Sequence, residues 1–383
     1  METIKLTKKI CFIVTDAISF NVLCRGQLEY FRDHSDLDVT LISGGSNKEL
    51  DLLRKRGVGK VINAKFQRKP SPIQDARSLV FLIHYLRSDH FDLIVYSTPK
   101  ALLLGSIAGA FSLKSKKIAI VHGRVYENFT GLKKLIFQSF DQLSFFLSSK
   151  VVFVSKSLLQ NYIDDKILDN KTGKIIKQGS FNGVNISVFH PVNSDEKFRL
   201  RAELDLPQES FLICVVGRIC IDKGIRDIKL LAESLKDKRL KFVFVGSFED
   251  DKAREIVKEI TERHQGYYLP HTPRVYEIFQ CSDLHLFLSH REGFGNVAVE
   301  AASCGIPTFA YDVVGVKDSV NDGISGQRFN FQDISAVSQA ITESVYDDDF
   351  EQKYSGARDW VVENFDQEEV WDSYLKFYLA NIN

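Results

Sequence analysis

Short apolar runs alternate with segments of helical spacing along almost the whole chain, and this rhythm constrains the fold more than any other feature. A typical run is followed by turn residues and then by apolar residues at helical spacing, as in Leu28–Phe31 or Ile228–Leu235. Strands buried on both faces read as apolar runs, so the repeat predicts an α/β fold with largely parallel sheets covered by helices. The expected strands are residues 10–14, 38–43, 92–96, 118–121, 151–154, 211–216, 241–245, 284–288 and 307–310.

The rhythm resets near residues 190–200, where the polar, proline-containing stretch His190–Lys197 is suited to a linker. A chain of 383 residues is also too long for one ordinary core. We therefore expect two doubly wound domains, residues 1–190 and 191–365, and a C-terminal helix over 366–383 that packs on the first domain. Ligands of such folds are expected at the carboxyl ends of the strands and in the cleft between domains.

Residues 291–301, Arg-Glu-Gly-Phe-Gly-Asn-Val-Ala-Val-Glu-Ala, form the segment richest in chemical information. A turn containing Gly293 and Gly295 exposes backbone N–H groups, and Asn296 is suited to cap a helix that begins near Val297. The start of a helix offers N–H groups and a partial positive charge to an anion, typically a phosphate. The segment therefore predicts an anion-binding turn at a helix start.

Two carboxylates, Glu292 and Glu300, stand eight residues apart around this turn. Glu300 lies about one turn into the expected helix, within reach of hydroxyls attached to a bound phosphate, whereas Glu292 precedes the turn and can meet a second polar group. A phosphate, sugar hydroxyls and two acceptors together suggest a nucleotide-sugar site. The alternative is an ordinary capped helix with a solvated acidic face, and the spacing alone does not decide between the two.

A second charged segment follows the first strand of the second domain, at residues 217–224 (Gly-Arg-Ile-Cys-Ile-Asp-Lys-Gly). Arg218 and Lys223 can converge on one anion, since arginine offers a planar fork to phosphate oxygens and lysine a compact charge. They could equally be ordinary loop charges. Neither GxxxxGK[ST] nor GxGxxG occurs in the chain, which argues against ATPases and ordinary dinucleotide enzymes.

Taken in order, residues 217–224 and 289–320 resemble the donor half of retaining glycosyltransferases of family 4, which have the GT-B fold. Further matching residues are Ser97–Lys100, Val121–Gly123 and Asn182–Asn185, the last followed by Phe189 and Pro191. The resemblance is closest to the branch that builds polyprenyl-diphosphate-linked glycans, such as O-antigen, capsule and bacterial N-glycans. It implies two Rossmann-like domains that face each other across a cleft, with the C-terminal helix crossing back.

The resemblance also implies roles for individual residues. Arg218 and Lys223 would hold the donor diphosphate, Glu300 the ribose hydroxyls and Glu292 the transferred sugar, while His122 would reach the sugar near the reacting carbon. Ser19, Lys100 and Asn182 are weaker candidates for the acceptor side of the cleft. The donor-binding set is Arg218, Lys223, Gly293, Phe294, Gly295, Asn296, Val297 and Glu300, and the catalytic set is Glu292, His122, Arg218 and Lys223.

The implied reaction transfers a hexose or N-acetylhexosamine with retention from a nucleotide-diphosphate sugar, UDP-linked, by front-side attack of a lipid-linked saccharide. Neither a cofactor nor a metal is expected, because Asp347–Asp349 is a polar loop rather than a metal-binding DxD. Two departures from the family pattern stand out. Only Gly26 occurs where many members carry a Gly-Gly pair, and Ser289-His290 stands where the branch often has Ser-Tyr.

Charge is unevenly divided along a chain of zero net charge. Residues 1–190 carry 28 Lys and Arg against 16 Asp and Glu, a net +12, and the remainder carries −12. A lipid diphosphate at an anionic membrane would favour such a basic domain, and Lys133, Lys134 and Phe137 suggest an interfacial helix. A solvated basic face is the alternative. No nucleic-acid recognition motif accompanies the charge, so nucleic acid is not an expected partner.

The remaining sequence features bear on where in the cell the protein is located. The six cysteines show no metal-like spacing and are expected as buried, reduced thiols. No secretory signal is visible, and the longest uncharged apolar stretch, residues 101–113, is short of the roughly 18 residues of a spanning helix. We therefore expect a cytoplasmic protein, peripheral on the inner face of the plasma membrane. A non-hydrolysing UDP-sugar epimerase and a non-catalytic sugar-nucleotide-binding protein are the alternative functions.

Overall fold

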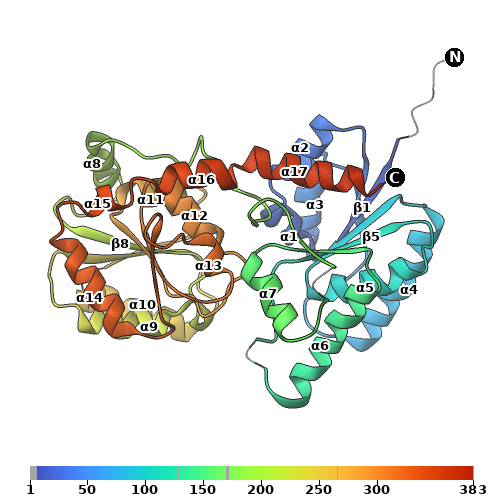
Figure 1. Cartoon of the computed structure of the whole chain (residues 1–383), viewed down its shortest axis with the longest axis horizontal. Helices are drawn as coiled ribbons and strands as arrows, with labels where there is room; N and C mark the ends of the chain where they lie inside the picture. The colour runs from blue at the N-terminus through green and yellow to red at the C-terminus, as the bar shows by residue number, and fades with distance from the viewer. Residues whose placement is uncertain (1–6, 128, 170–171, 265, 383) are drawn as a thin grey trace. The chain divides into compact units, whose positions relative to one another are not determined.

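The computed structural model describes residues 7–127, 129–169, 172–264 and 266–382, which form two compact units (Figure 1). The first unit runs up to Gly183 and takes in the residues from Glu368 onward, and the second spans Val184–Gln367. From the sequence we expected the first division at residue 190. The chain passes between the units near Val184 and again near Gln367, and an isolated β-bridge inside the second unit joins these two points. In it Val184 N donates to Phe365 O at 2.8 Å, and Gln367 N donates to Val184 O at 3.0 Å.

The described part of the first unit contains a parallel sheet of seven strands in the order β3-β2-β1-β4-β5-β6-β7. Its strands are β1 Lys9–Asp16, β2 Asp38–Gly44, β3 Lys60–Asn63, β4 Leu93–Ser97, β5 Lys116–Val121, β6 Lys150–Phe153 and β7 Gly173–Ile175. Its helices are α1 Ala17–Leu23, α2 Gln27–His34, α3 Asn47–Lys55, α4 Pro72–Ser88, α5 Pro99–Ala110, α6 Gly131–Phe146, α7 Lys156–Asp164 and the last helix, α17 Gln367–Ala380.

The described part of the second unit contains a parallel sheet of six strands in the order β10-β9-β8-β11-β12-β13. Its strands are β8 Phe211–Val216, β9 Leu240–Val245, β10 Tyr267–Leu269, β11 Leu284–Phe287, β12 Thr308–Tyr311 and β13 Gly326–Phe329. Its helices are α8 Ser194–Glu203, the 3₁₀ helix η1 Ile221–Lys223, α9 Ile225–Ser234, α10 Asp251–His264, α11 Val275–Cys281, α12 Asn296–Ser303, α13 Val316–Ser319, α14 Ile334–Val345, α15 Phe350–Lys353 and α16 Ala357–Phe365.

Alternate residues of the second sheet point into two separate cores. Phe242 and Phe244 of β9 belong to the core beneath α9, α10 and α14, whereas Val243 and Val245 belong to the core beneath α8 and α11. This two-sided burial is the physical reason why the central strands read as uninterrupted apolar runs. The expected α/β class with two parallel, doubly wound sheets is confirmed.

All nine expected strands are present, and the four further strands within the described residues are the sheet edges β3, β7, β10 and β13. Their sequences, KVIN, GKI, YYL and GQRF, are short and mix polar with apolar residues. An edge strand is paired on one side only and is partly exposed, so it needs no apolar run. Apolar runs therefore revealed the interior of each sheet and not its edges.

Helix α17 packs within the first unit through aromatic side chains. Tyr374 contacts the ring of Phe181 at 5.0 Å between centroids, and Trp371 Nε1 donates to Asn182 Oδ1 at 2.8 Å. Gly26 has a φ of +79°, and a Cβ there would overlap the Trp371 ring. The single glycine that the sequence retains after β1 is therefore required by the packing of α17.

Candidate functional site

The loops after β8 and β11 lie next to each other because these strands are neighbours in the second sheet. The strand order reverses between them: the chain first builds outward through β9 and β10 and then returns to β11 on the other side of β8. In open α/β sheets, ligands bind outside the carboxyl ends of the strands at such a reversal. The two charged segments singled out in the sequence, 217–224 and 291–301, follow these two strands.

Two glycines stand where the backbone is crowded: Gly224 lets the loop after β8 approach the end of β11, and Gly295 lets the turn before α12 pack against Ser319 and Phe287. Gly224 has a left-handed backbone, and a Cβ on it would overlap the carbonyl oxygen of Leu288 at the end of β11. Gly295 has a φ of +90°, and its Cβ would lie 2.8 Å from Ser319 Oγ and 2.9 Å from the Phe287 ring. Neither the backbone angle nor the space would accept a larger residue at low cost.

Lys223 and Glu292 form an ion pair between the two loops, with only 23% and 14% of their side chains exposed. Beside it, Arg291 Nη2 lies 2.6 Å from Asp222 Oδ2. The structure thus brings together two residues, Lys223 and Glu292, that the sequence predicted as parts of one site although they are 69 positions apart. A cation held beside a carboxylate can exchange part of that contact for a ligand phosphate while the carboxylate accepts from sugar hydroxyls.

Arg218 lies on the same loop but pairs with Glu249, whose Oε1 is 2.5 Å from Arg218 Nη1. Its side chain is 61% exposed. Burial lowers the pKa of Arg218, but the hydrogen bond and charge of Glu249, with smaller contributions from Cys220 and Glu292, raise it above its usual value. Arg218 therefore remains a cation in the electrostatic neighbourhood of Glu292, in a side chain free enough to reorient toward an anion.

Helix α12 begins at Asn296, and its N-cap is Gly295 in the left-handed conformation, without a side-chain cap. The expectation that Asn296 caps a helix starting at Val297 is therefore wrong by one residue. The physical reason is that the crowded turn needs a positive φ at the capping position, which glycine supplies and asparagine adopts less readily. Phe294 is buried against Phe365, at 5.2 Å between ring centroids, and so anchors the turn through its side chain.

Glu300 lies in the second turn of α12 and is half-buried. Among the described residues its carboxylate has no hydrogen-bond or ion-pair partner, and burial raises its pKa from 4.5 to about 7. A carboxylate that has lost water without gaining a partner favours a ligand that brings hydrogen-bond donors. The hydroxyls of a sugar are such donors.

The predicted residues of the first unit are placed differently. His122 follows β5 and forms a T-shaped contact with the Phe181 ring, at 4.6 Å between ring centroids. Its Nε2 is buried and has no hydrogen-bond partner among the described residues, and burial lowers the pKa of His122 to about 4. Lys100 Nζ donates to Asp75 Oδ1 at 2.7 Å and to Lys69 O at 2.8 Å. Lys100 therefore joins α5 to the start of α4, and His122 is held as a neutral imidazole.

Ser19 and Asn182 complete this group. Ser19 is half-buried in α1, whose N-cap Asp16 accepts from Ile18 N at 3.1 Å. Asn182 receives the Trp371 hydrogen bond and donates weakly to Arg25 O at 3.4 Å. The Asn182 amide therefore contacts α17 through Oδ1 and the turn before α2 through Nδ2, which gives this residue a structural role within the first unit.

Helix α6 carries the three residues predicted to meet a membrane. Lys133 and Lys134 lie in its first turn, with Lys133 Nζ 3.7 Å from the centre of the Phe129 ring. Phe137 packs against Phe129 at 5.3 Å and Tyr126 at 6.1 Å, so it belongs to an aromatic cluster at the base of the helix. The exposed apolar face of α6 consists of other residues: Leu132, Leu135, Ile136, Phe140, Leu143 and Phe146.

Sequence reasoning missed Glu249, which pairs with Arg218, and the Arg291–Asp222 pair beside Lys223 and Glu292. Asp222 and Arg291 stand directly beside Lys223 and Glu292 in the chain, so alternating charges were visible. Their pairing became evident only when β8 and β11 proved to be neighbours. Among the described residues, no group of three or more His, Cys, Asp or Glu side chains is arranged to hold a metal ion.

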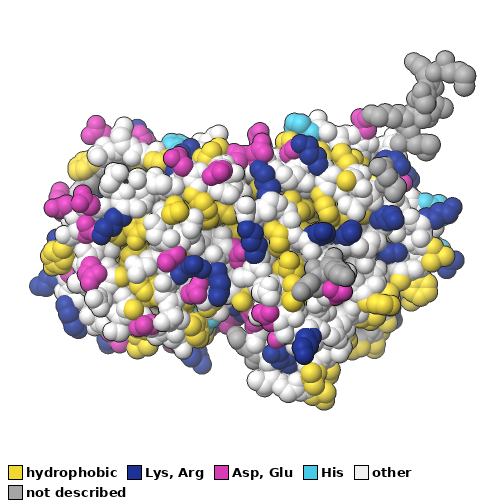
Figure 2. All heavy atoms as spheres, in the orientation of Figure 1, with side chains coloured by type: hydrophobic (Ala, Val, Ile, Leu, Met, Phe, Trp, Pro, Cys, Tyr) yellow, Lys and Arg dark blue, Asp and Glu magenta, His cyan; other side chains and the backbone are white. Residues whose placement is uncertain are grey.

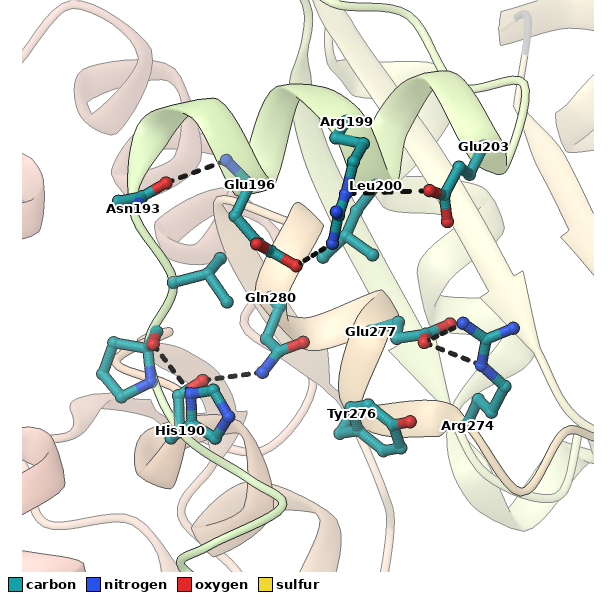
Figure 3. Close-up of a pocket in the computed structure, with 12 residues that line it drawn as sticks. His190, Asn193, Glu196, Arg199, Leu200, Glu203, Arg274, Tyr276, Glu277 and Gln280 are labelled. Atoms are coloured by element: carbon teal, nitrogen blue, oxygen red, sulfur yellow. Dashed lines mark hydrogen bonds and ion pairs between the residues drawn. The ribbon is translucent and has the colours of Figure 1, made fainter.

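A separate cavity of about 390 Å³ lies between α8 and α11 and contains none of the predicted site residues (Figure 3). Its charged side chains pair with one another, as Arg199 with Glu196 and Arg274 with Glu277, and Gln280 Nε2 donates to His190 O at 2.9 Å. Because these charges satisfy one another, the cavity is a weaker candidate for binding than the loops after β8 and β11.

Comparison with known proteins finds relatives among glycosyltransferases. Residues 196–358 match the family described as Glycosyl transferases group 1, and this stretch contains both charged loops. The chain is 26% identical over 380 residues to the capsular polysaccharide biosynthesis glycosyltransferase CapM of Staphylococcus aureus, covering 97% of each chain. It is 23% identical over 334 residues to the N,N'-diacetylbacillosaminyl-diphospho-undecaprenol alpha-1,3-N-acetylgalactosaminyltransferase of Campylobacter jejuni, covering 85% of this chain and 87% of the other.

Among solved structures, Anabaena Alr3699/HepE in complex with UDP superposes with a TM-score of 0.77 and 18% identity, covering 97% of this chain and 100% of the other. The same Anabaena protein in complex with UDP-glucose gives a TM-score of 0.75 and 19% identity, covering 97% and 99%. Likeness at this identity shows a shared fold. It confirms the expected architecture of two Rossmann-like domains.

Proposed function

We propose that this chain, whose residues 196–358 match the family of glycosyl transferases group 1, transfers a hexose or N-acetylhexosamine from a UDP-sugar to a lipid-linked saccharide. The observation that carries the proposal is the site at the β8/β11 reversal. There the Lys223–Glu292 pair and the partnerless carboxylate of Glu300 combine a cation for phosphate with two acceptors for hydroxyls. UDP is the proposed nucleotide because a protein of the same fold binds UDP and UDP-glucose.

The main chemical task is to stabilise the departing diphosphate as the anomeric C–O bond breaks. In the proposed mechanism Lys223 and Arg218 neutralise the charge that develops on the leaving phosphate. The acceptor hydroxyl attacks the anomeric carbon on the face from which the diphosphate leaves. It forms the new C–O bond and gives its proton to the leaving phosphate oxygen. Attack on that face retains the anomeric configuration. No metal is required in this scheme, because side-chain cations and the start of α12 provide the charge stabilisation.

Glu292 and Glu300 are assigned different hydroxyls. Glu300 accepts from the ribose, because it lies deeper in α12, and Glu292 accepts from the transferred sugar, because it borders Lys223. His122 is proposed to approach the sugar near the reacting carbon as a neutral imidazole, in keeping with a pKa of about 4. A neutral imidazole can donate or accept one hydrogen bond there without adding charge.

The acceptor is proposed to be a saccharide on a polyprenyl diphosphate, the class to which the diphospho-undecaprenol in the name of the Campylobacter relative belongs. The test is to supply a panel of UDP-linked hexoses and N-acetylhexosamines with a short-chain polyprenyl-diphosphate saccharide. We expect transfer that depends on the acceptor. Turnover of the donor without an acceptor would favour the epimerase alternative, and no turnover of any donor in the panel would refute the proposal.

We also propose that the first unit meets an anionic membrane surface through α6. The six apolar side chains of its exposed face, Leu132 to Phe146, recur at helical spacing and are 41–85% exposed. Figure 2 shows hydrophobic and basic side chains gathered over α6, at the lower edge of the picture. An apolar stripe beside Lys133 and Lys134 is suited to lie in a headgroup region. No helix in the described parts of the chain has the length and hydropathy needed to span a bilayer.

Binding to lipid vesicles tests the proposed membrane contact of α6 independently of catalysis. We expect the protein to co-sediment with vesicles containing anionic phospholipid and to be released by salt. Leu135→Ser with Phe140→Ser should weaken binding at least about tenfold, because each removes apolar area that would enter the interface. The matched control is Val22→Ser with Leu52→Ser, which changes exposed apolar residues on α1 and α3 of the same unit. Equal loss in both double variants would contradict a role for α6.

A further inference from the structure

His290 immediately precedes the loop residues Arg291 and Glu292, and its side chain turns toward helix α9. Its Nε2 lies 2.8 Å from Asp227 Oδ2, and the same carboxylate oxygen accepts from the Tyr311 hydroxyl at 3.1 Å. An ionised carboxylate can only accept hydrogen bonds, so Nε2 carries the proton in this contact. His290 thus links the loop after β11 to the helix that follows the loop after β8.

The contact is mostly buried. The Asp227 side chain is 8% exposed and that of His290 22%, and Tyr311 is fully buried in β12. The His290 and Phe331 rings form a T-shaped contact at 5.1 Å between centroids. A buried carboxylate is costly unless donors satisfy it, and losing one of two donors leaves the charge undercompensated. The fold therefore resists any movement that would withdraw His290 from Asp227.

Three consecutive loop residues are paired across to α9 and its preceding loop, but the pairs differ in burial. Arg291–Asp222 is 31% and 47% exposed, and an exposed ion pair contributes little. Lys223–Glu292 is partly buried, but under the proposed function both partners must also contact the donor. His290–Asp227 is the pair that can persist unchanged when a ligand binds. His290 N also donates to Asp222 O at 3.0 Å, so the backbone of His290 is hydrogen-bonded to the loop that precedes α9.

We infer that His290 is a positioning residue: with Asp227 it holds the loop after β11 on α9, and so keeps Glu292 beside Lys223. The catalytic consequence rests on the proposed function, whereas the effect on the loop does not. This role also gives a physical meaning to the Ser-His sequence before Arg291. The imidazole reaches a carboxylate on α9 that carries one hydroxyl partner already, and it supplies the second donor.

The test compares four variants with the wild-type chain. His290→Phe keeps the ring and removes the donor, and His290→Gln restores a donor near the position of Nε2. His290→Phe with Asp227→Asn removes the donor together with the buried charge. Lys229→Met is the matched control, because it breaks an ion pair of 2.6 Å between α9 and Glu259 that does not involve the loop.

Amide hydrogen exchange over residues 289–297 reads the loop directly and needs no substrate. We expect His290→Phe to raise exchange there about tenfold, with little change in the strands, and His290→Gln to stay within about threefold of the wild type. For UDP-sugar transfer, kcat should fall about tenfold in His290→Phe while the affinity for UDP changes less than about threefold, because misplaced reacting groups slow chemistry more than binding.

The double variant separates positioning from general stability. Removing the uncompensated charge should restore thermal stability toward the wild type, while loop exchange stays fast and kcat stays low. Recovery of kcat together with stability, or wild-type loop exchange in His290→Phe, would overturn the inference. Should the wild-type protein turn over no UDP-sugar, the proposed function fails, and hydrogen exchange still decides whether His290 holds the loop.

Discussion

The loops at the carboxyl ends of the two sheets differ in the charged side chains that they carry. In the second unit, the loops at the β8/β11 reversal gather a cation, a paired carboxylate and a second carboxylate without a partner, in Lys223, Glu292 and Glu300. In the first unit, the corresponding reversal lies between β1 and β4. The predicted residues after β4 and its neighbour β5 are a lysine, Lys100, that is already paired, and a neutral histidine, His122.

The difference fits the proposed function, in which the second unit binds the donor and the first unit the acceptor. A site built from opposed charges is suited to a diphosphate and its attached sugars, because charge-assisted hydrogen bonds are strong in a partly buried site. A site with its charges neutralised is suited to a neutral saccharide hydroxyl. Part of the positive charge of the first unit is instead carried by Lys133, which is exposed, and Lys134, which is half-buried, on α6, where it can attract an anionic surface away from the reacting groups.

The largest predicted effect is on the charged pair. Lys223→Ala should lower kcat/KM for transfer about 100-fold, because it removes a cation placed at the leaving phosphate, and Glu292→Ala should lower it at least about tenfold. Circular dichroism and thermal unfolding should show that both variants fold. Lys229→Ala is the control, since it also removes a partly buried lysine of the second unit that is paired with a glutamate. Normal turnover by both site variants would place the donor elsewhere.

The sequence predicted the second unit better than the first, and for physical reasons. The motif around Glu292 places its chemistry in short loops beside one another, so local spacing carried most of the information. The pairing of His290 with Asp227 could not be predicted, because it depends on contacts 63 positions apart and on a tyrosine from a third strand. In the first unit, Lys100 looked available from the sequence because its partner, Asp75, lies on a different helix.

Backbone detail was also beyond the sequence. Asn296 has the side chain of a capping residue, and only the crowding of Gly295 by Ser319 and Phe287 shows why glycine takes that position instead. The edge strand β13 gave no apolar signal, although its pairing with β12 completes the sheet. Strands with both faces covered were predictable because burial leaves a compositional signal, and edges leave none.

A smaller effect is predicted on the free energy of unfolding, which should depend on pH through Glu300. Its pKa is about 7 in the folded chain and near 4.5 when unfolded, so the protonated carboxyl is favoured by folding. The resulting contribution to the free energy of unfolding is complete below about pH 4.5, is lost as the pH rises to about 7, and amounts to at most about 3 kcal/mol. Urea unfolding at a series of pH values should show this fall in the wild type and a flatter dependence in Glu300→Gln.

The same carboxyl should make donor binding depend on pH in the opposite direction. Ribose hydroxyls donate to the ionised form, so the affinity for UDP should increase between pH 6 and pH 8. Calorimetric titration of the wild type and Glu300→Gln with UDP measures this directly. The variant should bind more weakly and lose most of the increase. An unchanged increase in the variant would show that Glu300 is not the acceptor for the ribose.

The smallest effect on activity is predicted for Lys100. Its pair with Asp75 is buried, with side chains 14% and 21% exposed, and it also satisfies the carbonyl of Lys69. Lys100→Met should lower the melting temperature by about 2–6 °C, because Asp75 loses its cation, and should change kcat/KM less than about threefold. Asp75→Asn should reproduce the loss of stability, since it breaks the same pair from the other side. A drop in kcat/KM that appears in Lys100→Met and not in Asp75→Asn would instead show that the lysine itself contacts a substrate, and the first unit would then handle charge as the second does.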